Sequence, residues 1–216
     1  MNFRILIPAV AVVFVLYQCN NNSNESTNNS NPNSYIHSQL SKDDSIFYAQ
    51  EGTKIAKQMY AGILSHLQKA IEEQGYYESV RYCNENALRL TDSLSQHFGI
   101  KAKRTSLKIR NPKNAPDSLE KKVLEMYATT LSKKPTIIPV KNGIQFFTPI
   151  YIAPICLNCH GKPYQDIPDV TMKALQKWYP NDEATNYELY DIRGMWSIFF
   201  PSDYRSKFNN ATSPNQ

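Results

Sequence analysis

The chain contains one short motif in which two cysteines and a histidine are closely spaced. Cys156 and Cys159 are three positions apart, and His160 directly follows the second cysteine. On a helical turn, residues three apart lie on one face, so both sulfurs can bond to one edge of a single flat ligand. C-x-x-C-H is the pattern by which haem is attached covalently, and its histidine can bind the iron axially. The motif therefore predicts one covalent haem c held by Cys156, Cys159 and His160.

Two other interpretations of this motif are open from the residues alone. A structural zinc site needs four nitrogen or sulfur ligands, and the chain has no second C-x-x-C and no H-x-x-x-H. A thiol–disulfide oxidoreductase also uses C-x-x-C, normally at the start of a helix in a βαβ unit, and leaves the histidine without a task. This alternative predicts free thiols and no visible absorption.

Residues 1–18 have the pattern of an export signal. Arg4 is followed by an apolar run over residues 5–16, which is shorter than the roughly 20 residues that span a bilayer. Residues 16–19, L-Y-Q-C, resemble the bacterial lipobox L-x-x-C, although the two middle residues are larger than usual. We expect an exported lipoprotein, anchored on the periplasmic side of a membrane through lipid on Cys19. A signal that is conventionally cleaved, or not cleaved, is the alternative.

The rest of the 216-residue chain fits one domain behind a tether. Residues 20–34 include eight Asn and no large apolar side chain, so they cannot bury enough surface to offset chain entropy. The formal charge of +5, from 24 Lys+Arg and 19 Asp+Glu, is too mild to predict nucleic-acid binding. We expect a tether at 19–42, a haem-binding domain at 43–205 and a polar tail at 206–216.

Apolar residues at steps of four predict a long first helix, which begins after a cap at Asp43 or Asp44 and ends near Gly75. A second helix is expected from about Tyr77 to Phe98, stopped by Gly99. The stripe of the first helix consists of Ile55, Met59, Ile63, Leu67 and Ile71. Cys83 lies on the inward stripe of the second helix, where it either packs as a small apolar residue or contacts something else in the core.

The middle of the chain predicts strands and one helix. Residues 100–109 read as a strand, and its Arg104 and the following Arg110 are candidates to bind haem propionates, because Arg can hold a carboxylate with two hydrogen bonds. Asp117 and Glu120 predict a capping box that opens a helix through Leu131. Residues 136–140 and 143–152 predict a hairpin that turns at Asn142-Gly143. A short helix that ends near Trp178 and a closing strand at 190–201 are expected after it.

These residues together resemble a family of PAS-like c-type haem domains, which occur as stand-alone exported proteins and as sensory inputs of membrane histidine kinases. The resemblance covers roughly residues 43–202, and its segment R-T-S-L-K-I-R-N-P-K-N-A-P-D is far more specific than C-x-x-C-H alone. It implies an α+β fold with a PAS-like central antiparallel sheet flanked by helices. The matching segments are residues 83–85, 104–117, 149–151, 156–161 and 191–194.

The resemblance also implies the two axial ligands of the iron. It assigns His160 to one side and the thiolate of Cys83 to the other. An open sixth position is an alternative, and a methionine or a second histidine would give a different class of cytochrome. The candidates for that position are Met126, Met195, His66 and His97.

A thiolate ligand stabilises ferric iron, lowers the reduction potential and becomes labile when the iron is reduced. The sequence therefore predicts a membrane-tethered, single-haem, c-type cytochrome-like protein that acts in redox or gas sensing or in low-potential electron transfer with a partner protein. We expect no enzymatic activity, because the chain shows no Ser-His-Asp order and no phosphate loop. A thiol–disulfide oxidoreductase and a haem-free ligand-binding lipoprotein are the alternatives.

Overall fold

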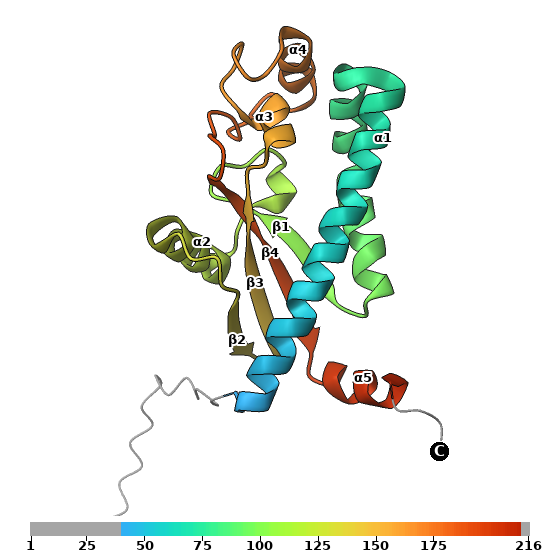
Figure 1. The fold of residues 1–216 in the computed structure, drawn as a ribbon, viewed down its shortest axis with the longest axis vertical. Coiled ribbons are helices and arrows are strands. Elements are labelled where there is room, and N and C mark those ends of the chain that lie inside the picture. The colour runs from blue at the N-terminus through green and yellow to red at the C-terminus, as the bar shows by residue number, and fades with distance from the viewer. Residues whose placement is uncertain (1–39, 213–216) are drawn as a thin grey trace, which may run out of the picture. The chain divides into compact units, whose positions relative to one another are not determined.

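A computed structural model of the chain describes residues 40–212, which form an α+β fold with a four-stranded antiparallel sheet and a long first helix, as predicted. The expected signal, Cys19 and nearly all of the tether lie outside the described residues. Figure 1 shows the elements, which are α1 (Lys42–His97), β1 (Lys101–Thr105), η1 (Pro112–Asn114), α2 (Ser118–Thr130), β2 (Thr136–Val140), β3 (Gly143–Tyr151), α3 (Pro154–His160), α4 (Asp169–Trp178), β4 (Ile192–Pro201) and α5 (Tyr204–Thr212).

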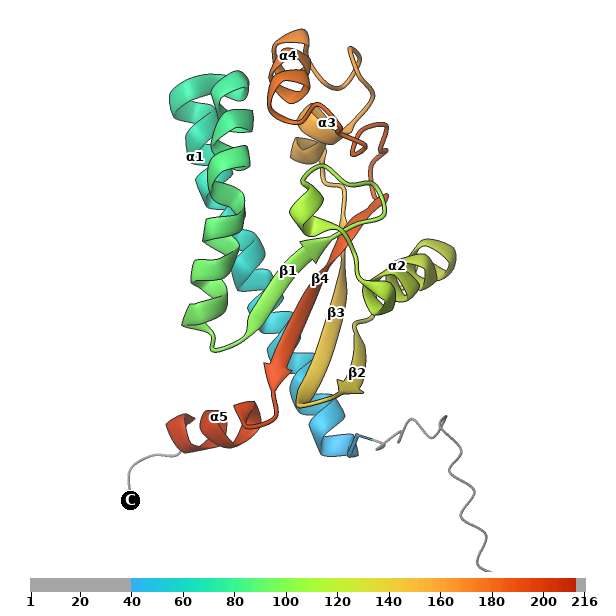
Figure 2. The same cartoon turned by 180° about the vertical axis from the view of Figure 1, so that it is seen from behind.

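Helix α1 is two helices that meet at Gly75. This glycine has φ 75° and ψ 175°, a conformation that is strained for residues with a side chain, and the chain reverses there. Figures 1 and 2 both show the two halves running side by side in opposite directions. The predicted break is confirmed. The cap differs from the expectation, because Ser41 accepts the Asp44 N–H while Asp43 and Asp44 occupy the first turn.

The sheet has the strand order β1-β4-β3-β2, so the last strand in sequence lies between the first and the third. Strands β2 and β3 form the predicted hairpin, and Asn142 adopts φ 67° in its turn. Strand β4 pairs with β3 on one side and with β1 on the other, so it joins the hairpin to the segment that follows α1.

The sheet buries both faces, as the alternation of side chains along its strands requires. On one face, Phe146, Trp196, Ile198 and Phe200 pack against the first half of α1, including Ile55 and Met59. On the other face, the two neighbouring strand residues Phe147 and Met195 pack against α2. The residues of α2 in this second layer are Val123, Leu124 and Tyr127.

Helix α2 begins with the predicted capping box. The Asp117 carboxylate accepts the N–H of Glu120, and the Glu120 carboxylate accepts the N–H of Asp117. Leu131 ends the helix in a left-handed conformation. Within residues 40–212, no helix is long and apolar enough to cross a membrane.

Two predicted boundaries differ in the structure. The strand expected over residues 100–109 ends at Thr105, because the Thr105 hydroxyl bonds to the Asn114 carbonyl and the chain leaves the sheet. The segment expected as a polar tail, residues 206–216, begins within α5. The Phe208 ring packs edge-on against Phe47 at 5.2 Å, and Arg205 pairs with Asp44, so contacts with the start of α1 order this helix.

Gly52 marks the closest approach of α1 to the sheet. A Cβ atom on Gly52 would lie 2.5 Å from the ring of Phe146, well inside van der Waals contact. We therefore expect Gly52→Ala to lower the free energy of unfolding by about 1–3 kcal/mol through overpacking. Urea denaturation of the full-length protein measures the change.

Gly62→Ala is the matched control in the same helix. A Cβ on Gly62 would lie at an ordinary 3.4 Å from Leu94, so the variant should gain up to about 1 kcal/mol of helix propensity. Equal stability changes in the two variants would contradict the close packing of α1 on Phe146.

Candidate functional site

The C-x-x-C-H motif lies on the short helix α3, which follows β3 directly. Pro154 occupies the first turn of this helix, where a proline is tolerated, and Gly161 ends it with a bond from its N–H to the Leu157 carbonyl. Cys156 and Cys159 are both partly buried, and neither forms a disulfide. The helical placement of the motif agrees with the one-face arrangement predicted from its spacing.

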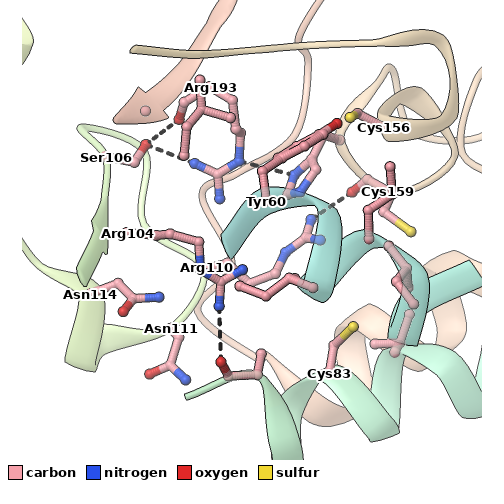
Figure 3. Close-up of a pocket in the computed structure, with 18 of the residues that line it drawn as sticks. Tyr60, Cys83, Arg104, Ser106, Arg110, Asn111, Asn114, Cys156, Cys159 and Arg193 are labelled. Atoms are coloured by element: carbon pink, nitrogen blue, oxygen red, sulfur yellow. Dashed lines mark hydrogen bonds between the residues drawn. The ribbon is translucent and has the colours of Figure 1, made fainter. Parts of the chain in front are cut away.

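A cavity of about 270 Å³ lies between α1, α3 and the chain that follows β1. Figure 3 shows the labelled residues that surround it. Much of its wall is apolar and comes from both halves of α1. The predicted stripe of the first half therefore divides, since Ile55 and Met59 pack on the sheet whereas Leu67 and Ile71 line the cavity.

Every predicted site residue within residues 40–212 lines this one cavity. These residues come from α1, from β1 and the loop after it, and from α3. They are far apart in the sequence, so only the tertiary structure brings them together. They are Cys83, Arg104, Arg110, Cys156, Cys159 and His160.

The imidazole of His160 is held by a backbone carbonyl. Its Nδ1 lies 2.8 Å from the Ala184 oxygen and 3.3 Å from the Nε of Arg193. The shorter contact is to an oxygen that can only accept, so Nδ1 carries the proton and Nε2 keeps its lone pair. Burial, together with the positive charges of Arg110 and Arg193, lowers the pKa of His160 well below its usual value. His160 is therefore a neutral imidazole with one nitrogen available as a ligand.

The cysteine thiols of the cavity are shielded from water. Burial raises the pKa of Cys159 to about 11, and the neighbouring Arg110 only partly offsets this effect. Burial also raises the pKa of Cys83, against the opposing charges of Arg104 and Arg110. The thiols of Cys83 and Cys159 are therefore mainly protonated at neutral pH while no ligand is bound.

Of the five residues considered for the second axial position, Cys83 alone lines the cavity. Met195 and Met126 belong to the layer between the sheet and α2, on the other face of the sheet. His66 bonds to the Gly62 carbonyl of its own helix, and His97 packs against Phe98. The geometry thus separates candidates that the sequence left open.

Arg110 makes a dense set of hydrogen bonds around the motif. It bonds to both carboxylate oxygens of Asp182, with the shortest contact at 2.8 Å, and to the carbonyls of Cys159 at 2.6 Å and Ala184 at 3.2 Å. Asp182 also accepts the N–H of Ala184. The pair therefore fixes both the end of α3 and the carbonyl that orients His160.

Arg104 and Arg193 complete the polar part of the wall. Arg104 donates to the Ala87 carbonyl at 3.2 Å and lies over the Trp196 ring, while its buried Nε has no hydrogen-bond partner. Arg193 donates to Ser106 at 2.7 Å and was not predicted as a site residue, although it lies in the resembling segment 191–194. The sequence signal that could have identified this position is the neighbouring Gly194. A Cβ atom on Gly194 would lie 2.3 Å from the Thr105 carbonyl oxygen, so a glycine is needed where β4 approaches β1.

The fold and the site together define an α+β domain of the PAS-like class in which a helical C-x-x-C-H motif and a distant cysteine face one cavity. The chain belongs to the Tll0287-like family, whose model matches residues 20–201. The crystal structure of the cyanobacterial haem protein Tll0287 has a similar fold, with a TM-score of 0.53 and 23% identity over 76% of this chain and 98% of that one. No protein of curated function matches the chain.

The Arg110–Asp182 pair predicts a large effect on stability. Both side chains are largely buried, at 13% and 9% exposure, so Asp182→Asn leaves Arg110 without its counter-charge. We expect a loss of about 3–5 kcal/mol in the free energy of unfolding. Urea denaturation of the full-length protein measures it.

The Lys162–Glu188 pair provides the control. Its side chains are 48% and 69% exposed, so Glu188→Gln should change the stability by no more than about 1 kcal/mol. If Asp182→Asn were as mild as Glu188→Gln, the proposed structural role of the buried pair would be wrong.

Proposed function

We propose that this protein is a single-haem, c-type cytochrome-like protein that carries its haem on Cys156 and Cys159, with His160 and Cys83 as axial ligands. The observation that carries the proposal is that these four side chains line one cavity although Cys83 lies far from the motif in the sequence. The description of the structurally similar Tll0287 as a haem protein also supports it.

The residues present fit such a group. The donor set is one imidazole with a free nitrogen and three thiols that are not in disulfides, beside an apolar wall. Among residues 40–212, no three His, Cys, Asp or Glu side chains are grouped to bind a metal ion unaided. A porphyrin needs only two axial protein ligands, because the ring itself supplies the other four.

Haem would supply one-electron redox chemistry, and the chain's own residues would set its properties. The Ala184 carbonyl orients His160, and the apolar side chains of α1 exclude water. A thiolate from Cys83 favours the ferric state and lowers the reduction potential. These properties support either redox or gas sensing or low-potential electron transfer, with a redox or sensor protein as the partner.

The two alternatives make different demands on the same cavity. A thiol–disulfide oxidoreductase has no task for the oriented imidazole of His160 or for Cys83, which lines the same cavity. A haem-free ligand-binding lipoprotein has no use for three unpaired cysteines around the pocket. The observations on the cavity therefore favour haem over both.

The cofactor proposal is tested by producing the full-length protein together with cytochrome c maturation machinery. We expect a pyridine haemochrome spectrum of the c type, with the haem remaining on the denatured chain. Cys156→Ser/Cys159→Ser should lose this covalent attachment, because no thioether bond can form. A colourless wild-type protein whose two motif thiols both react with an alkylating agent would refute the proposal.

The axial role of Cys83 predicts a change in the spectrum. Cys83→Ala in the matured protein should shift the Soret band and raise the reduction potential, because the strong thiolate donor is lost. His66→Ala is the control on the same helix, since His66 does not line the cavity, and it should leave both quantities unchanged. An unaltered spectrum in Cys83→Ala would mean that another residue holds the position.

We also propose that the protein is exported and held on the periplasmic side of a membrane by lipid on Cys19. The apolar run and the L-Y-Q-C segment support this proposal. Cys19→Ser should move the protein from the membrane fraction to the soluble fraction after cell lysis. Retention of the variant in the membrane fraction would argue against a lipid anchor.

A further inference from the structure

The cavity contains two arginines whose charge no carboxylate neutralises. Among the ion pairs of residues 40–212, Arg110 pairs with Asp182, but neither Arg104 nor Arg193 has an acidic partner. Both arginines line the cavity. A largely buried cation is costly unless it is paired, so the folded chain offers two positive charges to a bound anion.

Arg104 lines the cavity and has few hydrogen-bond partners within the chain. One of its terminal nitrogens bonds to the Ala87 carbonyl, and the Trp196 ring supports its guanidinium at 5.9 Å. Its Nε is inaccessible to solvent and has no hydrogen-bond partner. The Nε is therefore enclosed by protein atoms, and the terminal nitrogens of Arg104 are the donors that a ligand in the cavity would meet.

Neighbouring side chains add further donors beside Arg104. Asn111 uses its side-chain oxygen to accept the N–H of Lys113, so its amide nitrogen is the end that remains for other contacts. Figure 3 shows Asn111 and Asn114 next to Arg104, and both line the cavity. No acidic residue occurs from position 101 to 116. This part of the wall is therefore suited to a carboxylate.

Arg193 provides a second cation in the same part of the cavity. Its Nη1 bonds to the Ser106 hydroxyl at 2.7 Å and to the Lys108 carbonyl at 3.2 Å, and its Nε lies 3.3 Å from Nδ1 of the neutral His160. These neutral partners hold the guanidinium in place without cancelling its charge. Arg193 and Arg104 are thus two fixed cations without a counter-ion.

The arginines and the motif cysteines lie at different ends of the cavity. In Figure 3, Arg104, Arg193 and Ser106 are on one side, and Cys156 and Cys159 are on the other. A haem has the same polarity, since its two vinyl groups and its two propionates lie along opposite edges of the ring. The sulfur end would meet the vinyl edge and the guanidinium end the propionate edge.

We propose that Arg104 and Arg193 form the subsite for the two propionate carboxylates, and that Arg110 is instead a positioning residue for the motif. This inference rests on the proposed haem binding and assigns different tasks to the cavity arginines. Arg110 is less suited to the first task, because Asp182 already neutralises its charge and its Nε and Nη2 are engaged by Asp182, Cys159 and Ala184.

Binding of two porphyrins to the haem-free, full-length protein tests the subsite. The probes are ferric protoporphyrin IX and its dimethyl ester, which differ only in the two carboxylates, and Soret titration gives the two dissociation constants. Wild type should prefer the free acid by roughly 10- to 100-fold, the effect of charge-assisted hydrogen bonds in a buried site. Arg104→Met and Arg193→Met should each lose a large part of that preference.

Matched variants separate charge recognition from general damage. Arg104→Lys should retain part of the preference, because it keeps the charge but not the fork of donors. Arg110→Met should weaken both porphyrins by a similar factor and leave their ratio unchanged. Binding of the ester by Arg104→Met serves as the folding control, since the ester does not need the guanidinium.

The possible failures are distinguishable. If wild type binds neither porphyrin, the propionate subsite is overturned, and if the matured protein is also colourless, the proposed function is wrong as well. If wild type binds acid and ester equally, or if Arg104→Met and Arg193→Met both retain the full preference, haem binding stands and the propionate subsite is overturned. A loss of preference in Arg110→Met alone would assign the subsite to Arg110.

Discussion

The site depends above all on the buried pair of Arg110 and Asp182. Through this pair the loop after β1, the end of α3 and the segment before β4 are joined, although they are distant in the sequence. The Ala184 carbonyl is held in this network, and it determines which nitrogen of His160 is protonated. One ion pair thus connects the position of the motif helix to the chemical state of its histidine.

The sheet and the α1 hairpin provide the rigid frame for this network. Phe146 and Phe200 pack the first half of α1 against the sheet, and Gly75 returns the second half so that Cys83 faces α3. The cavity therefore lies between elements whose positions are fixed by contacts outside it, α1 by the sheet and α3 by the Arg110–Asp182 network. The α1 residues Leu67 and Ile71 that line the cavity lie further along the helix than Ile55 and Met59, which pack on the sheet. The cavity therefore does not interrupt the packing of α1 on the sheet.

The three arginines of the cavity differ in whether their charge is neutralised. Arg110 is neutralised and structural, while Arg104 and Arg193 are positive and lack acidic partners. Arg104 and Arg193 both contribute to the lowered pKa of His160, and Arg104 also opposes the rise in the pKa of Cys83 that burial causes. An anionic ligand with an apolar body suits this environment, and a neutral or cationic ligand does not.

The sequence alone determined those features that depend on neighbouring residues. The break at Gly75, the capping box of Asp117 and Glu120, and the turn at Asn142 are local effects of backbone conformation and side-chain hydrogen bonds, and each was predicted. The resemblance added Cys83 to the motif residues. Tertiary structure alone decided that α5 forms, that the strand β1 stops at Thr105, and that Arg110 has an acidic partner whereas Arg193 bonds to Ser106. These outcomes depend on partners such as Phe47, Asn114 and Asp182, which lie so far along the chain that no local pattern identifies them.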